Sequence, residues 1–256
     1  MKVDNVSLLG VKFAKLNIWQ LNRLLDDYIQ NDEKAIIANH NLHSVYLYHQ
    51  VSEFRSFFDL ADLVHADGMS LIYWGKLLGY NLDIKNRITY LDWINPLLEL
   101  ANKREWKIFY LGGEKGVARK AALRLQDEYS NIKFRTHHGF FETTKKNNMR
   151  ILEKINGFKP HILMVGMGMP RQELWIKRNI ESIKSNIILP SGACFDYIAG
   201  TAKTPPRWLG KYNLEWLYRL VSEPKRLSYR YLVEPWHLIP KFIIDIQKLV
   251  FKNSEE

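Results

Sequence analysis

The stretch with the densest chemistry is Gly166–Trp175, which reads GMGMPRQELW. It follows an apolar run at 162–165 and opens a segment with helical spacing. A buried strand, a glycine turn and a helix with proline in its first turn predict a phosphate-sized anion site, because glycines admit close ligand approach and first-turn N–H groups are free. Arg171 and Gln172 add side-chain donors. The pattern favours an enzyme of nucleotides or nucleotide sugars, and an ordinary strand-to-helix turn is the alternative.

Polar and glycine residues also follow the other apolar runs of the chain. The carboxyl ends of parallel strands lie at one edge of a sheet, where α/β proteins bind their ligands. We therefore expect a single crevice lined by these strand ends: Asn39–Asn41, Asp67–Gly68, Gly112–Gly113, His137–Gly139, Gly166–Arg171 and Ser191–Gly192.

Short apolar runs alternate with segments of helical period, which predicts an α/β fold: a Rossmann-like, mostly parallel sheet with helices on both faces. The expected strands are 35–38, 107–111, 132–135, 162–165 and 187–189. The expected helices are 42–58, 69–78, 91–103, 117–129, 148–156 and 170–180.

The alternation of strand-like and helix-like segments stops after Gly200. We therefore divide the chain into a core, 1–200, and a helical appendage, 201–256. The appendage carries ten Lys/Arg against six Asp/Glu, with aromatic residues between them. Such a mixture suits an anionic membrane surface or a phosphate-bearing lipid. A solvated helical face over buried aromatics is the plainer interpretation.

Composition narrows the class of protein. The net charge of +10 favours an anionic partner. The single cysteine, Cys194, excludes an internal disulfide framework, and we expect it to be a buried packing residue. We find neither a signal peptide at the N-terminus nor an apolar stretch of the roughly 18 residues that a spanning helix needs. These features predict a cytoplasmic protein, peripheral at the inner face of the cell membrane.

Ordered blocks along nearly the whole chain resemble the WecG/TagA/CpsF family, glycosyltransferase family 26. The strongest block is Gly166–Trp175. Two positions depart from the family pattern: Asn39 stands where threonine is usual, and Tyr90 where glycine is usual. The other matching blocks are 8–11, 39–41, 61–69, 87–89, 109–113, 138–141, 192–200, 205–208, 215–220 and 223–227.

The resemblance implies an inverting hexosyltransferase (EC 2.4.1) that moves a sugar from a UDP-sugar to a polyprenyl-diphosphate-linked saccharide. Members act in the assembly of teichoic acid, capsule and exopolysaccharide, and N-acetylmannosamine or a related hexose or uronic acid is the expected sugar. The sequence does not identify the sugar, the acceptor saccharide or the oligomeric state, although a homo-oligomer is compatible with it.

Residue roles follow from the resemblance. Asp67 is expected to be the general base and Arg87 to stabilise the leaving diphosphate. An Asx turn and a surface cation are their respective structural alternatives. For Gln172 the alternative to substrate binding is a helix cap. The residues expected to bind substrate are Asn39, Asn41, Gly112, Gly113, Gly166, Gly168, Arg171, Gln172, Asp196, Arg219, Arg226 and Arg230.

No Asp-x-Asp triplet is present, so we expect no metal and no other cofactor. Two other functions compete with the glycosyltransferase. An NAD(P)-binding oxidoreductase would use the glycine turns, but Arg171 stands where the third glycine of its fingerprint belongs. A non-catalytic basic module would bind polyanions or membranes in a salt-sensitive manner. We expect no nucleic-acid partner.

Overall fold

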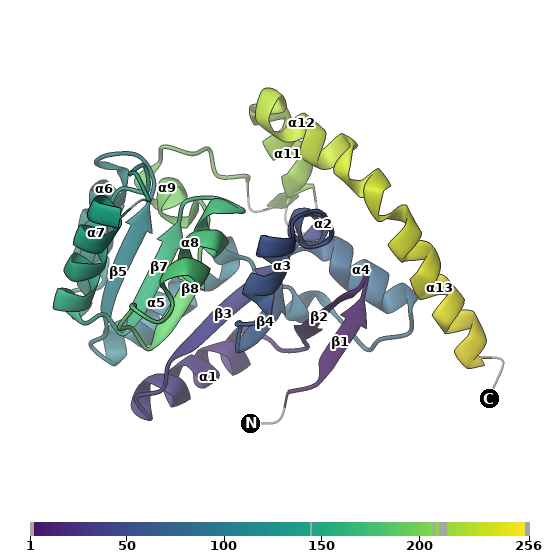
Figure 1. Cartoon of the computed structure of the whole chain (residues 1–256), viewed down its shortest axis with the longest axis horizontal. Coiled ribbons are helices and arrows are strands. Elements are labelled where there is room, and N and C mark those ends of the chain that lie inside the picture. The colour runs from purple at the N-terminus through teal and green to yellow at the C-terminus, as the bar shows by residue number, and fades with distance from the viewer. Residues whose placement is uncertain (1–2, 144, 207, 210–213, 254–256) are drawn as a thin grey trace.

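The fold is built on one eight-stranded sheet with the order β1-β2-β4-β3-β8-β7-β5-β6. The computed structural model (Figure 1) describes residues 3–143, 145–206, 208–209 and 214–253. Only β1 and β2 pair antiparallel, and the other neighbours run parallel. The strands are β1 (Asn5–Leu8), β2 (Val11–Ala14), β3 (Ala35–His40), β4 (Leu63–Ala66), β5 (Lys107–Gly112), β6 (Lys133–His137), β7 (Ile162–Gly166) and β8 (Ile187–Pro190).

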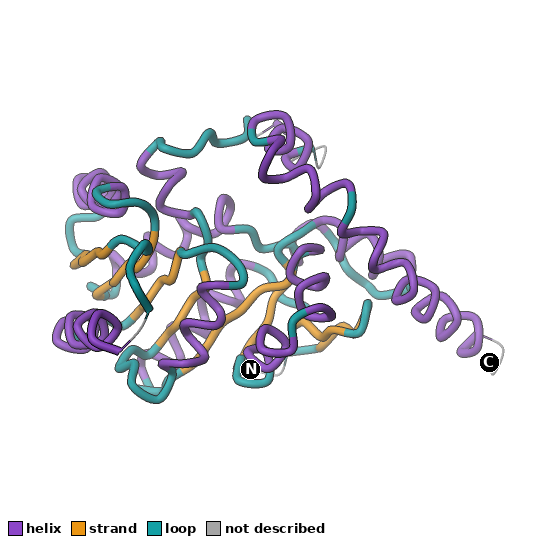
Figure 2. Tube along the Cα trace, turned by 45° about the horizontal axis from the view of Figure 1, so that its top comes forward, coloured by secondary structure: helices purple, strands orange, loops and turns teal. Residues whose placement is uncertain are grey.

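Helices cover both faces of the sheet (Figures 1 and 2). One face packs its apolar core against α1 (Ile18–Gln30), α5 (Tyr90–Lys103), α6 (Val117–Glu128) and α9 (Cys194–Ala199). The other packs against α3 (Ser52–Phe58), α7 (Lys145–Phe158) and α8 (Arg171–Asn179). A third cluster joins β1 and β2 to α2 (Leu42–Gln50) and α4 (Met69–Leu77). The predicted fold class is confirmed.

All five predicted strands are present. The elements that were not predicted include α1, β1, β2, β4 and α9, and α2 and α3 were predicted as one helix. Helix α1 carries a capping box at Asn17 and buries Leu21 and Leu25. This sequence pattern is typical of a helix start and could have predicted α1. Strands β1, β2 and β4 have four residues each, too few for a clear period. The predicted helix 42–58 is wrong: Val51 is extended, with φ −123° and ψ 105°, and separates α2 from α3.

The C-terminal part consists of α11 (Glu215–Ser222), α12 (Pro224–Leu232), a 3-10 turn (Glu234–Leu238) and α13 (Ile239–Asn253). Residues 207, 210–213 and 254–256 of the predicted appendage lie outside the described residues. In Figure 1, α11 and α12 lie above the carboxyl edge of the sheet and α13 runs down beside α4 and β1. The boundary at 200 stays a prediction, since this part packs onto the rest of the fold.

Three appendage carboxylates hold it against the core. Glu215 pairs with Arg87 at 3.3 Å, and Glu234 with Nδ1 of His43 at 2.6 Å. Asp245 on α13 is 7% exposed and accepts from the Leu9 backbone N–H at 2.6 Å and from the Trp74 indole at 3.0 Å. Because buried carboxylates need such donors, these contacts specify where the appendage lies.

No helix within the described residues is both long enough and apolar enough to cross a membrane.

Candidate active site

Asp67 lies at the carboxyl edge of the sheet, directly after β4 and before α4. Its backbone N–H donates to the His40 carbonyl at 2.7 Å, which ties it to the end of β3. Asn41 caps α2 by accepting from the Ser44 N–H at 3.0 Å. Its amide nitrogen is 3.3 Å from Oδ2 of Asp67 and donates to it. The cap therefore also orients the carboxylate, because one side chain makes both contacts.

Arg87 is brought beside Asp67 by backbone pairing. The Ile88 N–H donates to the Ala66 carbonyl at 2.8 Å, so the segment before α5 extends the sheet next to β4. The guanidinium of Arg87 binds Asp92 at 2.9 Å and Glu215 at 3.3 Å, and its side chain is 9% exposed. This burial and pairing differ from the surface cation that was the alternative interpretation.

The appendage supplies two further arginines. Arg219 on α11 and Arg230 on α12 both act electrostatically on Asp67. Arg226 does not join them: it is exposed and pairs with Glu223 at 2.6 Å on the same helical turn. Of the three appendage arginines that were expected to bind substrate, Arg219 and Arg230 therefore act on Asp67 and Arg226 does not.

The electrostatics at Asp67 are dominated by desolvation. Burial raises the pKa of Asp67 to about 6, although the Asn41 hydrogen bond and the three guanidinium groups act to lower it. Burial lowers the pKa of Arg230, and the neighbouring Arg219 guanidinium acts in the same direction. Nε of Arg87, Arg219 and Arg230 is buried without a partner among the described residues. Such a group of open cationic donors suits an anionic oxygen-rich ligand.

The glycine turns at the next strand ends have structural causes. A Cβ on Gly166 would lie 2.0 Å from the Tyr110 hydroxyl, and one on Gly112 would lie 2.3 Å from the Gly166 carbonyl oxygen. Only glycine fits these contacts. The Gly113 N–H is already used, donating to the Gly166 carbonyl at 3.2 Å. Close strand packing therefore accounts for Gly112 and Gly166, and substrate contact by Gly112, Gly113, Gly166 and Gly168 stays a prediction.

Gln172 joins two of these turns. It is 1% exposed, and its Oε1 accepts from the Gly168 N–H at 3.2 Å and the Gly192 N–H at 3.1 Å. Its amide nitrogen donates to Glu173 at 2.8 Å. The side chain thus holds the two turns together, which differs from the helix cap considered from sequence. Only the second N–H of its amide is left to bind the sugar donor.

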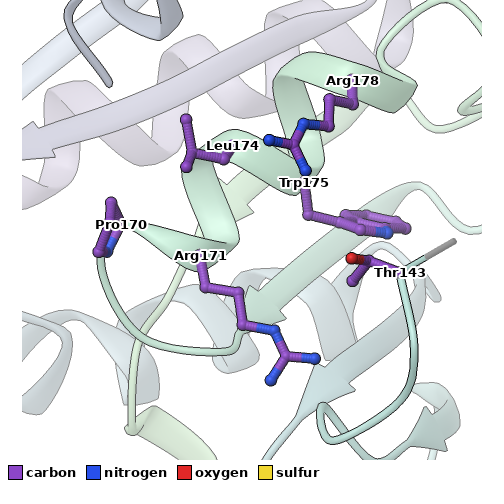
Figure 3. A pocket seen from close by; sticks show the side chains of 6 residues that line it. All are labelled: Thr143, Pro170, Arg171, Leu174, Trp175 and Arg178. Atoms are coloured by element: carbon purple, nitrogen blue, oxygen red, sulfur yellow. The ribbon is translucent and has the colours of Figure 1, made fainter. Parts of the chain in front are cut away.

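Arg171 points to a neighbouring loop. Its guanidinium donates to the Phe141 carbonyl at 2.8 Å and lies over the Phe140 ring at 5.9 Å. Figure 3 shows it beside Thr143 and Trp175 in a hollow of about 210 Å³. The predicted donor at the glycine turn therefore contacts the β6–α7 loop.

Asp196 and Cys194 lie on α9, across from the Gly112–Gly113 turn. A Cβ on Gly113 would lie 3.4 Å from Oδ1 of Asp196. Burial raises the pKa of Asp196. Cys194 is a free thiol, 5% exposed, and burial raises its pKa, which agrees with the predicted packing role.

A set of buried polar atoms lies at the same edge, and of their residues only Asn39 was predicted to bind substrate. Asn39 is 5% exposed; its amide nitrogen is 3.4 Å from the Pro190 carbonyl, and its Oδ1 has no partner among the described residues. Three further buried atoms have no hydrogen-bond partner among the described residues: Oε2 of Glu173, Oγ of Ser191 and the Tyr90 hydroxyl. Glu173 carried a signal, since it follows Gln172 in the strongest block, but only the fold shows that it is buried.

The described residues contain no group of three or more His, Cys, Asp or Glu side chains placed to hold a metal ion.

Comparison with known proteins places this site in context. The model of the glycosyl transferase WecG/TagA/CpsF family matches residues 6–252. The chain is 28% identical over 227 residues to a protein of Staphylococcus aureus (strain MW2), with 87% of each chain covered. That protein is named N-acetylglucosaminyldiphosphoundecaprenol N-acetyl-beta-D-mannosaminyltransferase. The corresponding protein of strain NCTC 8325 / PS 47 has the same name, identity and coverage.

The buried carboxyl of Glu173 generates a prediction about stability and pH. Burial raises its pKa from 4.5 to about 7, so the folded state binds this proton more tightly than the unfolded chain does. Ionisation then costs stability as the pH rises from about 4.5 through about 7. Glu173→Gln has no such titration. We expect the variant to exceed the wild type in free energy of unfolding by roughly 2–3 kcal/mol at pH 8 and by less than about 1 kcal/mol at pH 5.

Urea denaturation at pH 5, 6, 7 and 8 measures the difference. Glu153→Gln, at an exposed position on α7, serves as the control and should change stability little at any pH. A difference between Glu173→Gln and the wild type that is the same at every pH would contradict the prediction.

Proposed function

The chain belongs to the WecG/TagA/CpsF family of glycosyltransferases, and we propose that it transfers a sugar from a UDP-sugar to a polyprenyl-diphosphate-linked saccharide with inversion and without a metal ion. The name of the S. aureus relative supports a sugar of the N-acetylmannosamine type and an acceptor on undecaprenyl diphosphate. The observation that carries the proposal is the group of three arginines, each with a buried and unpartnered Nε among the described residues, around the half-buried carboxylate of Asp67.

In the proposed reaction Asp67 takes the proton of the acceptor hydroxyl as that oxygen attacks C1 of the donor sugar. The new glycosidic bond forms as the bond between C1 and the diphosphate oxygen breaks, and UDP leaves with the electron pair. A single displacement inverts C1. Asn41 holds the Asp67 carboxylate in place for this step through its 3.3 Å hydrogen bond.

The charge that develops on the diphosphate is stabilised by Arg87, Arg219 and Arg230. Their open Nε–H donors are fixed before the substrate arrives, which makes electrostatic stabilisation effective because little reorganisation is needed. Three guanidinium groups supply the positive charge that a divalent cation supplies in other transferases, and this supports the metal-independent form of the proposal. Two of the three come from the appendage, so the site is complete only when the appendage is docked.

The appendage also presents an apolar surface suited to a lipid-linked acceptor. Exposed apolar side chains continue from α11 to α13, among them Trp216, Val221, Leu232, Trp236, Ile243, Val250 and Phe251. Lys241 and Lys248 lie on the same helix as the last three. Apolar and aromatic groups mixed with cations bind the interface of an anionic bilayer. We propose that this surface holds the enzyme peripherally on the membrane, where the acceptor is.

The first prediction about the reaction concerns the general base. Asp67→Asn should keep its fold and its affinity for UDP but lose turnover, because the amide cannot accept the acceptor proton. In the wild type, kcat/KM should fall about tenfold per pH unit below pH 6, where Asp67 becomes protonated. UDP release with a GlcNAc-diphosphate-lipid analogue, measured with and without EDTA, tests both statements. Turnover retained in Asp67→Asn would place the base elsewhere, and turnover abolished by EDTA would overturn metal independence.

The second prediction separates the appendage arginines. Arg219→Ala and Arg230→Ala each remove a buried guanidinium that faces Asp67, and we expect kcat/KM to fall roughly 10–100-fold, as for loss of a charge-assisted hydrogen bond. Arg226→Ala is the matched control, since this exposed side chain pairs with Glu223, and should change kcat/KM less than about threefold. Equal losses in all three variants would contradict the assignment.

The third prediction concerns the membrane. Trp236 and Phe251 are each 70% exposed, so Trp236→Ser/Phe251→Ser should retain the fold yet lose roughly tenfold or more in affinity for vesicles with anionic phospholipid. Leu123→Ser/Met149→Ser removes two side chains of similar exposure from α6 and α7 and is the control. Co-sedimentation with vesicles measures binding. Equal binding by wild type and both variants would show that the appendage surface does not carry it.

A further inference from the structure

The Tyr90 hydroxyl is a buried donor without a partner among the described residues. Tyr90 is the first residue of α5, after the Thr89 cap. Its ring packs beside Trp93, with centroids 5.3 Å apart, and against the core cluster on that face of the sheet. The ring is therefore held in one place, and the hydroxyl makes no hydrogen bond with any described residue.

Such a hydroxyl requires an explanation, because buried phenols nearly always find a partner. Phenylalanine would fill the same volume without leaving a polar atom unsatisfied. Tyr110 at the same sheet edge shows the ordinary arrangement: its hydroxyl donates to the Gly192 carbonyl at 3.1 Å. Tyr90 lacks such a contact, which indicates that its partner is a molecule bound to the protein.

The surroundings of Tyr90 place it at the carboxyl edge of the sheet. The ionisable groups that act on it come from four different elements: Asp67 after β4, Tyr110 on β5, Glu173 on α8 and Cys194 on α9. These positions converge on the carboxyl edge of the sheet, where α/β folds bind ligands. Glu173 also has an open carboxyl oxygen there. The hydroxyl therefore lies near the proposed base and among groups that a bound sugar would contact.

We propose that Tyr90 is a specificity-determining residue, whose hydroxyl forms a hydrogen bond with a polar ring substituent of the transferred sugar. The inference rests on the proposed function, since it needs a sugar donor in this crevice. A buried hydroxyl that one donor satisfies is left unpaired by a donor that lacks the matching substituent, so the wrong donor is rejected. The Asp67 and arginine chemistry is shared by all donors and cannot make this distinction.

The test compares Tyr90→Phe with the wild type over UDP-N-acetylmannosamine, UDP-N-acetylglucosamine, UDP-glucose, UDP-galactose and UDP-glucuronate. We expect kcat/KM for the best wild-type donor to fall about tenfold or more in Tyr90→Phe, the size of one lost hydrogen bond. We expect kcat/KM of Tyr90→Phe for at least one poor donor to stay within about twofold of the wild-type value. The ratio of kcat/KM between the best donor and that poor donor should therefore become smaller. Affinity for UDP itself should not change.

Stability measurements separate this role from a structural one. Removing an unsatisfied hydroxyl should leave the thermal unfolding midpoint of Tyr90→Phe unchanged or raised, whereas Tyr110→Phe, which loses a real hydrogen bond, should unfold at a lower temperature. Tyr129→Phe is the activity control, because Tyr129 follows the end of α6, at the opposite edge of the sheet. Its donor preference should equal that of the wild type.

Two results would overturn the inference: a preference in Tyr90→Phe that equals the wild-type preference, or a loss of the same size for every donor and for UDP. Either would leave the proposed function standing if the wild type transfers a sugar. A wild type that binds neither UDP nor any of the five donors would instead overturn the proposed function and this inference together.

Discussion

The carboxylate of Asp67 lies half-buried beside three cations, and the rest of the site depends on how this arrangement is achieved. Backbone pairing brings Arg87 next to the end of β4, and α11 and α12 add Arg219 and Arg230 from above. Desolvation outweighs the three guanidinium groups and raises the pKa of the carboxyl to about 6. A base with this pKa is ionised at neutral pH yet basic enough to take a proton from a hydroxyl in the transition state.

In the proposed mechanism this arrangement makes the appendage part of the catalytic site. The carboxylates of Glu215, Glu234 and Asp245 tie it to the core at three separate places. Glu215 is central, because it binds Arg87 and so links the core arginine to the helix that carries Arg219. The outer surface of the same appendage is rich in exposed apolar side chains. One segment thus completes a polar site on its inner side and offers a lipid-compatible surface on its outer side.

The strongest sequence block works mainly as a scaffold. Gly166 is required because a side chain would collide with Tyr110, and Gln172 joins the Gly168 and Gly192 turns through one oxygen. These contacts shape the carboxyl edge on which the open polar atoms of Asn39, Tyr90 and Glu173 lie. The groups proposed to react come from elsewhere: from the end of β4, the segment before α5 and the appendage.

The sequence alone determined the fold class and the family, because hydrophobic period and ordered motifs are local properties of the chain. It also led to Asp67 and Arg87, through the resemblance. It did not separate Arg219 and Arg230 from Arg226, since all three are cations on short helices and only packing shows which ones face the core. Nor did it show that Glu173 and the Tyr90 hydroxyl are buried and open to a ligand. Burial and hydrogen-bond partners arise from contacts between distant segments, and those exist only once the sheet and the appendage have come together.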